Sequence, residues 1–197
     1  MQVSRKMAAS ALLALALSSC ASPPSPSPST AAQLKMTGDS GMFGAALPRI
    51  PSGTTQSLRT KMLCTTGGKV SITNVTPVNP TGGLAVTYWG IRPNPFQTGK
   101  GTDDPGDVTG TYPATSGFST APNAIVTGLC PPPGAEPNDV VSELAITVSK
   151  PSTATASAAS FRIDYNAGGD TQHLDIPVEL TLCDSADKTG ICAKANS

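Results

Sequence analysis

The sequence predicts an all-β domain that folds as an antiparallel sandwich of two sheets. Its 197 residues include 19 glycines and 19 prolines, a content that favours turns over long helices. Short runs alternate apolar and polar residues, which is the period of a strand with one buried face. Turn residues separate these runs at the spacing typical of β-sandwiches, and no run has the period of a helix.

The expected strands begin with residues 58–64, where every second side chain can share one face. A Gly-Gly pair at 67–68 then turns the chain into a second strand over residues 69–78. The apolar alternation of this strand changes phase at Val75, which predicts a β-bulge near Asn74.

Residues 84–91 are apolar on both faces, which favours a central strand. Trp89, the single tryptophan of the chain, is interpreted as the main aromatic residue of the core. A second interpretation places it in a contact patch with Tyr88, Arg92 and Phe96, because aromatic residues beside an arginine are typical of interfaces.

Residues 92–119 are rich in Gly, Pro, Asp and Thr, and we expect loops with short edge pieces there. A short strand is expected over residues 124–130, where three consecutive prolines at 131–133 end it. Residues 140–149 alternate again and predict a further strand.

The C-terminal part predicts a long hairpin. Residues 161–165 form its first strand, and the Gly-containing segment 166–170 forms its loop. The return strand over residues 174–182 has an apolar residue at every second position. Pro177 lacks a backbone N–H, which indicates an edge position for this strand.

Seven or eight short strands at this spacing resemble immunoglobulin-like sandwiches in architecture, although no specific family is matched. The Cys-Trp-Cys spacing of antibody domains is not present, because Cys64 and Trp89 are too far apart. We assign residues 58–197 to the sandwich and residues 33–57 to a lead-in segment with room for one early strand.

The N-terminus carries an export signal. Arg5 and Lys6 precede an uncharged apolar run over residues 7–17, which has the length of a signal-peptide core and is too short to span a bilayer. The run ends in Leu17-Ser18-Ser19-Cys20, which resembles the lipobox of bacterial lipoproteins. The alternative is an ordinary secretory signal that is cut elsewhere.

The lipobox resemblance implies that residues 1–19 are removed and that Cys20 carries the acyl chains. Membrane lipid would then be bound through Cys20, and the protein would be extracytoplasmic, anchored to the membrane in the cell envelope. Residues 20–32 consist mainly of Pro, Ser and Ala, which favours a disordered but extended tether. Twelve such residues would span about 35–40 Å.

Four cysteines remain in the exported part: Cys64, Cys130, Cys183 and Cys192. An even number of cysteines in an exported chain predicts disulfides. Four cysteines allow three pairings, of which we favour Cys64–Cys130 and Cys183–Cys192.

Charge excludes one class of partner and limits metal sites. Lys+Arg and Asp+Glu both number 13, and loss of the two signal-peptide cations leaves 11 − 13 = −2. Without a basic run, we expect no nucleic-acid binding. The only histidine, His173, excludes a His-rich zinc site.

An acidic loop is a weak candidate for calcium. Asp103, Asp104 and Asp107 lie in a Gly-rich segment and offer the oxygen ligands that Ca²⁺ takes. No glutamate closes the loop at the EF-hand spacing, so a solvated acidic turn is the favoured interpretation. We therefore expect no metal and no cofactor.

Three short motifs resemble the blocks of SGNH (GDS-type) esterases. Gly38-Asp-Ser-Gly41 is similar to their nucleophile block, Asp170-Thr-Gln-His173 to their C-terminal block, and Asn138-Asp139 to their Asn block without its preceding glycine. The resemblance implies Ser40 as nucleophile, His173 as base, Asp170 as its orienting partner and Asn138 as an oxyanion donor, on an α/β fold.

Three functional hypotheses follow, and the third, a carrier of a small ligand or ion, has no specific pocket in the sequence to support it. The first is a non-catalytic binding or structural module displayed outside the membrane, whose partner is an unknown protein or envelope polymer. The alternative is an esterase that uses the serine, aspartate and histidine named above. The predicted all-β fold favours the first hypothesis.

Overall fold

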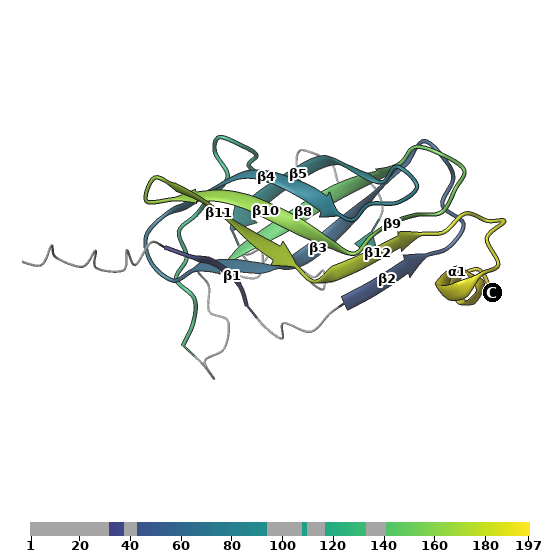
Figure 1. Ribbon diagram of the computed structural model, residues 1–197. Coiled ribbons are helices and arrows are strands. Elements are labelled where there is room, and N and C mark those ends of the chain that lie inside the picture. Colours follow the sequence, from purple (N-terminus) through teal and green to yellow (C-terminus); the bar gives the residue numbers. More distant parts are fainter. Residues whose placement is uncertain (1–31, 38–42, 94–107, 110–116, 133–140) are drawn as a thin grey trace, which may run out of the picture. The chain divides into compact units, whose positions relative to one another are not determined.

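The computed structural model describes residues 32–37, 43–93, 108–109, 117–132 and 141–197. The described chain contains twelve strands and one helix of six residues, so the prediction of an all-β fold is confirmed (Figure 1). None of the described helical structure combines the length and apolar character required to cross a bilayer.

The first sheet has the order β1-β3-β8-β5, with β6 paired to the start of β3, and all of its pairs are antiparallel. Its strands are β1 (Leu34–Met36), β3 (Thr54–Thr65), β5 (Ala85–Pro93), β6 (Val108–Thr109) and β8 (Ser142–Lys150). The centre of this sheet is the pair β3–β8, with β1 and β6 beside β3 and β5 beside β8.

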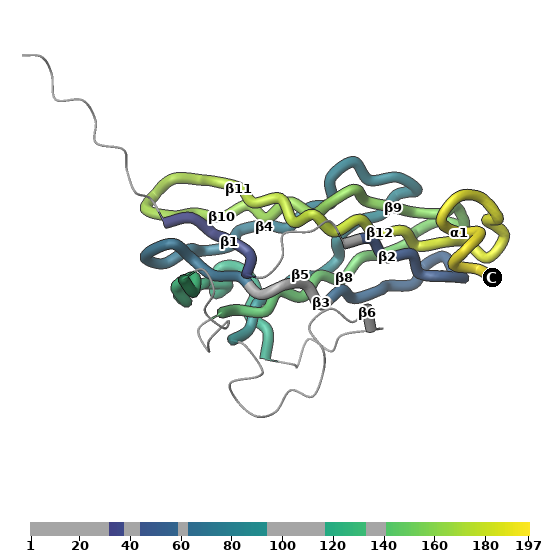
Figure 2. The backbone as a smooth tube through the Cα atoms, turned by 90° about the horizontal axis from the view of Figure 1, so that it is seen from below, coloured from purple at the N-terminus to yellow at the C-terminus, as the bar shows by residue number. Residues whose placement is uncertain are grey.

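The second sheet has the order β11-β10-β4-β7, and a third has the order β2-β12-β9. Their strands are β2 (Phe43–Leu47), β4 (Val70–Val78), β7 (Ile125–Val126), β9 (Ala156–Ala158), β10 (Ser160–Ala167), β11 (Asp170–Ile176) and β12 (Val178–Leu182). Only Ala159 separates β9 from β10, and only Pro177 separates β11 from β12, so one long hairpin runs through both sheets. Figure 2 shows this hairpin along one side of the domain and β3, β5 and β8 along the other.

The strand pairing agrees with the predicted immunoglobulin-like architecture. Constant-type immunoglobulin domains pair their strands as ABED in one sheet and CFG in the other. The orders β1-β3-β8-β5 and β4-β10-β11 reproduce that pairing in chain order. One detail of the prediction is wrong: the sandwich is not wholly antiparallel, because β2 pairs with β12 in parallel.

A single apolar cluster joins the three sheets. Its largest fully buried side chains include Phe161, Ile163 and Leu144, contributed by β10 and β8. The interpretation of Trp89 as the main core aromatic is wrong, because Trp89 is only half-buried and packs at the margin of the cluster. Phe161, which is wholly buried, takes that role.

The prediction of a central strand over residues 84–91 is also wrong, because β5 lies at the edge of its sheet. The register of β5 against β8 shifts between Val86 and Tyr88, so Thr87 is an extra residue. Beyond this bulge the inward face changes from even to odd positions, and Trp89 therefore packs on the same side as Val86.

Three local predictions in the other sheets are confirmed wholly or in part. The register of β4 against β10 skips Thr73, which is the bulge expected beside Asn74. The hairpin expected within residues 166–170 turns through two glycines of positive φ, 168 and 169. Pro177 follows the edge strand β11 as expected, but the chain then enters the middle of the third sheet as β12.

The helix α1 (Gly190–Ala195) ends the fold beside β2. Asn196, at its C-terminus, is 5% exposed and donates its side-chain amide to the carbonyls of Asp184 and Asp187. Arg49 donates its backbone N–H and its guanidinium to Asn196 in turn. These bonds tie the C-terminus to the turn that follows β2.

Candidate functional site

Several residues that the sequence singled out lie outside the described residues. They are the predicted acylation site Cys20, the motif residues Ser40 and Asn138, the aromatic residue Phe96, and the acidic loop of Asp103, Asp104 and Asp107. The predicted signal peptide over residues 1–19 and nearly all of the predicted tether also lie outside them.

Both predicted disulfides are confirmed. Cys64–Cys130 joins the end of β3 to the segment after β7, and Cys183–Cys192 joins the end of β12 to α1. The first bond lies beside a hydrogen-bonded pair of backbones, since Cys130 donates its N–H to Thr65. The two bonds therefore fix the C-terminal ends of β3 and β12 to segments that follow later in the chain.

The two described members of the esterase-like motifs lie on β11. Asp170 and His173 are both exposed, Asp170 at the hairpin turn and His173 opposite Asp164 of β10. This strand belongs to a β-sandwich and not to the α/β fold that the resemblance implies. In the described part of the chain, no three Asp, Glu, Cys or His side chains gather as metal ligands.

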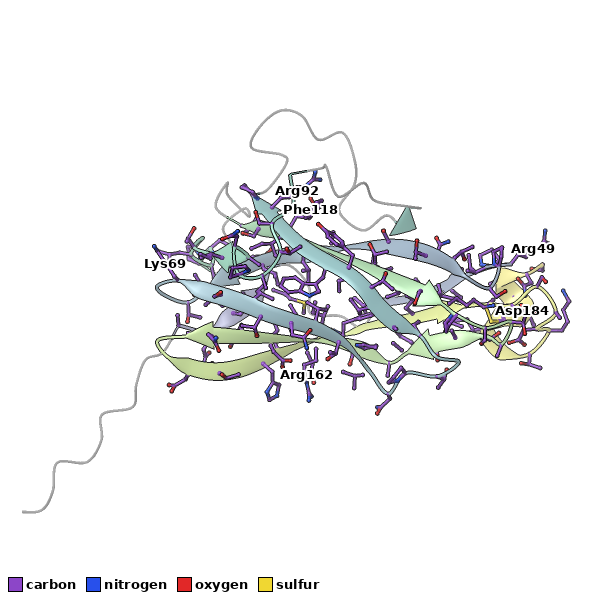
Figure 3. The ribbon with its side chains drawn as sticks, turned by 90° about the horizontal axis from the view of Figure 1, so that it is seen from above. Arg49, Lys69, Arg92, Phe118, Arg162 and Asp184 are labelled. Atoms are coloured by element: carbon purple, nitrogen blue, oxygen red, sulfur yellow. A yellow bond between two sulfur atoms is a disulfide. The ribbon has the colours of Figure 1, made fainter. Side chains whose placement is uncertain are left out.

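The outward face of β10 and β11 carries an ion pair beside this histidine. Arg162 donates Nε and Nη2 to the two carboxylate oxygens of Asp175 at 2.7 and 2.8 Å (Figure 3). The hydrogen bond from Arg162 lowers the pKa of Asp175, and His173 adds a smaller effect in the same direction. The carboxylate two residues after His173 on β11 is thus held by an arginine.

A buried lysine lies at the other end of the domain. The side chain of Lys150 is inaccessible to solvent, and its Nζ donates to the carbonyl of Ser152 at 3.0 Å and to Asp184 Oδ2 at 3.4 Å. The pKa of Asp184 is lowered, first by the backbone N–H of Ala186 and then by Lys150. This pair lies next to the Cys183–Cys192 bond, since Asp184 follows Cys183 directly.

A third ion pair lies beside a surface cavity that Arg92 lines. Arg92 Nε donates to Glu143 Oε2 at 2.6 Å, and the glutamate side chain is 2% exposed. The Arg92 guanidinium lies 4.7 Å from the centre of the Phe118 ring (Figure 3). The cavity beside it measures about 400 Å³ and is walled by Ile91, Ile125 and Val141 among others.

A separate cavity is a groove of about 360 Å³ between β4 and β5. We call it the β4–β5 groove. Its walls contain three threonines and an asparagine, two aromatic residues, and three small apolar residues. These are Thr73, Thr87, Thr120 and Asn74, then Tyr88 and Trp89, and finally Val75, Val86 and Ala121.

The groove lies between β5, the edge strand of the first sheet, and the part of β4 in the second sheet that β7 does not cover. β7 pairs with β4 only at Val70 and Ser71, and Ser119 bridges β5 only at Ile91. Among the described residues, no strand covers β4 beyond Ile72 or β5 before Ile91 on this side. On this side Trp89 and Val86 pack against the core as partly buried side chains.

No known protein family matches this chain. A search of curated proteins finds none with detectable sequence similarity. The function is therefore argued from the chemistry of the residues themselves.

The sequence singled out Tyr88 and Trp89, the two aromatic residues that line the groove, but did not predict a groove. It placed Tyr88, Trp89 and Arg92 in one contact patch, whereas the structure separates them. Tyr88 and Trp89 line the groove, whereas Arg92, the ion-pair partner of Glu143, lines the cavity of about 400 Å³. The phase change at Val75 was the one available signal, because it located the bulge on the β4 side.

Proposed function

We propose that this protein is a lipid-anchored component of a bacterial cell envelope whose β-sandwich acts as a non-catalytic binding or structural module outside the membrane. The carrying observation is that all four cysteines downstream of the lipobox-like motif are joined in two disulfides.

Disulfides support export because they form and persist in oxidising compartments and are rare in the cytosol. In this chain they follow a charged, apolar and then small-residue segment that ends in Cys20, the order expected of a lipoprotein signal. The four cysteines would otherwise be free thiols. Their pairing and the N-terminal pattern are independent features that favour the same location.

A non-catalytic role is supported by the hydrogen bonds that hold the acidic side chain beside the only histidine. Asp175, the carboxylate closest along the strand to the lone His173, accepts both hydrogen bonds of an Arg162 fork. A carboxylate held in this way is a structural partner rather than an orienting group for an imidazole base. Rigid sandwiches of this kind present loops and grooves for contact.

The anchor is tested in a bacterial host with the full chain. We expect the wild-type protein in the membrane fraction, released only by detergent, and the Cys20→Ala variant in the soluble extracytoplasmic fraction. The Cys64→Ala/Cys130→Ala double variant is the matched control, since it removes two cysteines and leaves the anchor in place. Equal membrane association of Cys20→Ala and wild type would contradict the anchor.

The binding role is tested separately by crosslinking on intact cells. We expect wild-type protein to crosslink to an envelope protein or polymer. Ester hydrolysis that is present in wild type and lost in Ser40→Ala would contradict the non-catalytic role and favour the esterase alternative.

A further inference from the structure

We propose that the β4–β5 groove binds an uncharged carbohydrate, namely one or two sugar residues of a neutral envelope glycan. This inference rests on the proposed function and adds the ligand class and the site. Three features of the groove carry it: its lining, its unpaired polar groups and its two bulges.

The lining matches the chemistry of a sugar ring. A sugar presents apolar C–H faces and a rim of hydroxyls, so its site needs aromatic surface beside hydrogen-bonding groups. Tyr88 and Trp89 supply the aromatic surface, and Asn74 supplies an amide. None of the described residues that line the groove is Asp, Glu, Lys, Arg or His, which favours an uncharged ligand because a buried charge requires a partner.

Several polar groups of the groove have donors or acceptors that could bond to a ligand. Within the described part of the chain, the Asn74 amide and the Trp89 indole N–H have no hydrogen-bond partner. The Thr73 hydroxyl donates to the Asp164 carbonyl at 3.1 Å and the Thr87 hydroxyl to the Thr147 carbonyl at 3.3 Å. Each threonine oxygen keeps lone pairs that accept. The groove thus offers both donors and acceptors, as sugar hydroxyls require.

Two β-bulges converge on this groove from different sheets. Thr73 is the extra residue of β4 and Thr87 the extra residue of β5, and both line the cavity. Bulges redirect side chains and are frequent next to binding sites. In β5 the bulge is what brings Trp89 to the core side while Tyr88 faces away from the core, and both residues line the groove.

The same bulges favour a glycan over a peptide. A peptide that adds to a sheet edge needs a regular row of backbone groups to pair with. Thr73 and Thr87 interrupt that row on both strands beside the groove. Side-chain recognition is therefore better supported than strand addition.

One wall of the groove is also preorganised. A methyl group added to Gly90 would lie 3.0 Å from the Tyr88 hydroxyl oxygen, so the Tyr88 side chain rests closely over this glycine. A side chain held by packing on a strand loses little freedom when a ligand binds. Tyr88 can therefore serve as a fixed wall.

The test uses Trp89 as its own reporter, because it is the only tryptophan of the chain. The full-length protein is held in a detergent without a sugar headgroup. It is titrated with neutral hexasaccharides of glucose, mannose, galactose and N-acetylglucosamine, and with hexagalacturonate as the charged probe. We expect a saturable change in emission, matched by calorimetry, with at least one neutral probe.

Two variants locate the site. Asn74→Ala should weaken binding about tenfold, the equivalent of one hydrogen bond. Asn166→Ala, an exposed asparagine on β10 outside the groove, should leave affinity unchanged. Both positions are exposed, so both variants should fold as wild type.

Three results would overturn the proposal: no saturable signal with any neutral probe, equal affinity of Asn74→Ala and wild type, or hexagalacturonate binding as tightly as the best neutral probe. These results are separable from failure of the proposed function. Membrane association and envelope crosslinking would persist in Asn74→Ala if only the groove assignment is wrong.

Discussion

Replacing Gly82 with alanine should destabilise the domain far more than the same change at Gly53. Gly82 lies in the turn between β4 and β5, and both glycines have positive φ, +59° and +74°. An added Cβ at Gly82 would collide with the Thr155 carbonyl oxygen and lie 2.7 Å from the Cα of Ala156. The space around Gly53 is empty to 4 Å.

The pair isolates the steric contribution. Both substitutions place alanine in the left-handed region, which costs about 1–2 kcal/mol, and both restrict the unfolded chain to the same extent. Only Gly82→Ala also pushes the backbone apart at the bridge between Thr81 and Ser157. Overpacking of this kind destabilises a folded protein by about 1–3 kcal/mol. We therefore expect a total loss of about 2–5 kcal/mol at Gly82 and about 1–2 kcal/mol at Gly53.

Urea unfolding with intact disulfides measures the difference, followed by Trp89 emission and by circular dichroism. With a slope of about 2 kcal/mol/M, the Gly82→Ala midpoint should lie about 0.5–1.5 M below that of Gly53→Ala. Coincident transitions by the two probes would justify the two-state treatment. If the two variants unfold at the same urea concentration, the steric cost inferred from the close approach of Gly82 to Ala156 is refuted.

Three further predictions concern the disulfides and the ion pairs. Cys64→Ala/Cys130→Ala should lower the free energy of unfolding by about 4 kcal/mol, because the bond closes a loop of 66 residues; an unchanged urea midpoint would contradict this. Arg92→Met should cost about 3–5 kcal/mol by leaving buried Glu143 without its partner, and adding Glu143→Leu should restore most of the loss; thermal melting of both variants tests this. The pKa of Asp175 is lowered by its partner Arg162, so the stability that this ion pair contributes is complete above the ordinary carboxyl pKa of about 3.9 and is lost as the pH falls through the lowered pKa. Between pH 6 and pH 2 the melting temperature of the Arg162→Gln variant should therefore decline less than that of the wild type.

Periodicity predicted the fold best where one face of a strand is polar. In β11 and β12 polar residues alternate with apolar ones, so the inward face of Ile176, Val178 and Leu180 was evident. In β5 both faces are apolar, and nothing in the sequence marks Thr87 as an extra residue. The face of Trp89 and the edge position of β5 were therefore wrong in the prediction.

Long-range side-chain pairs were the part that could not be predicted. Arg92 and Glu143 are 51 residues apart and meet only because β5 and β8 are neighbours. The groove has the same origin, since it joins residues of β4, β5 and the segment at Thr120. The disulfides were predictable because four cysteines allow only three pairings, and one pair is only nine residues apart.

The parallel pair β2–β12 has a mechanical consequence. Five residue pairs, from Phe43–Val178 to Leu47–Leu182, join strands close to the two ends of the domain. Tension drawn along these strands from opposite ends loads their backbone hydrogen bonds together in shear, instead of opening them one after another. The Cys183–Cys192 bond delivers load from the C-terminal helix to the end of β12 itself. Under pulling, the domain should yield abruptly and at higher force than one whose terminal strands peel apart.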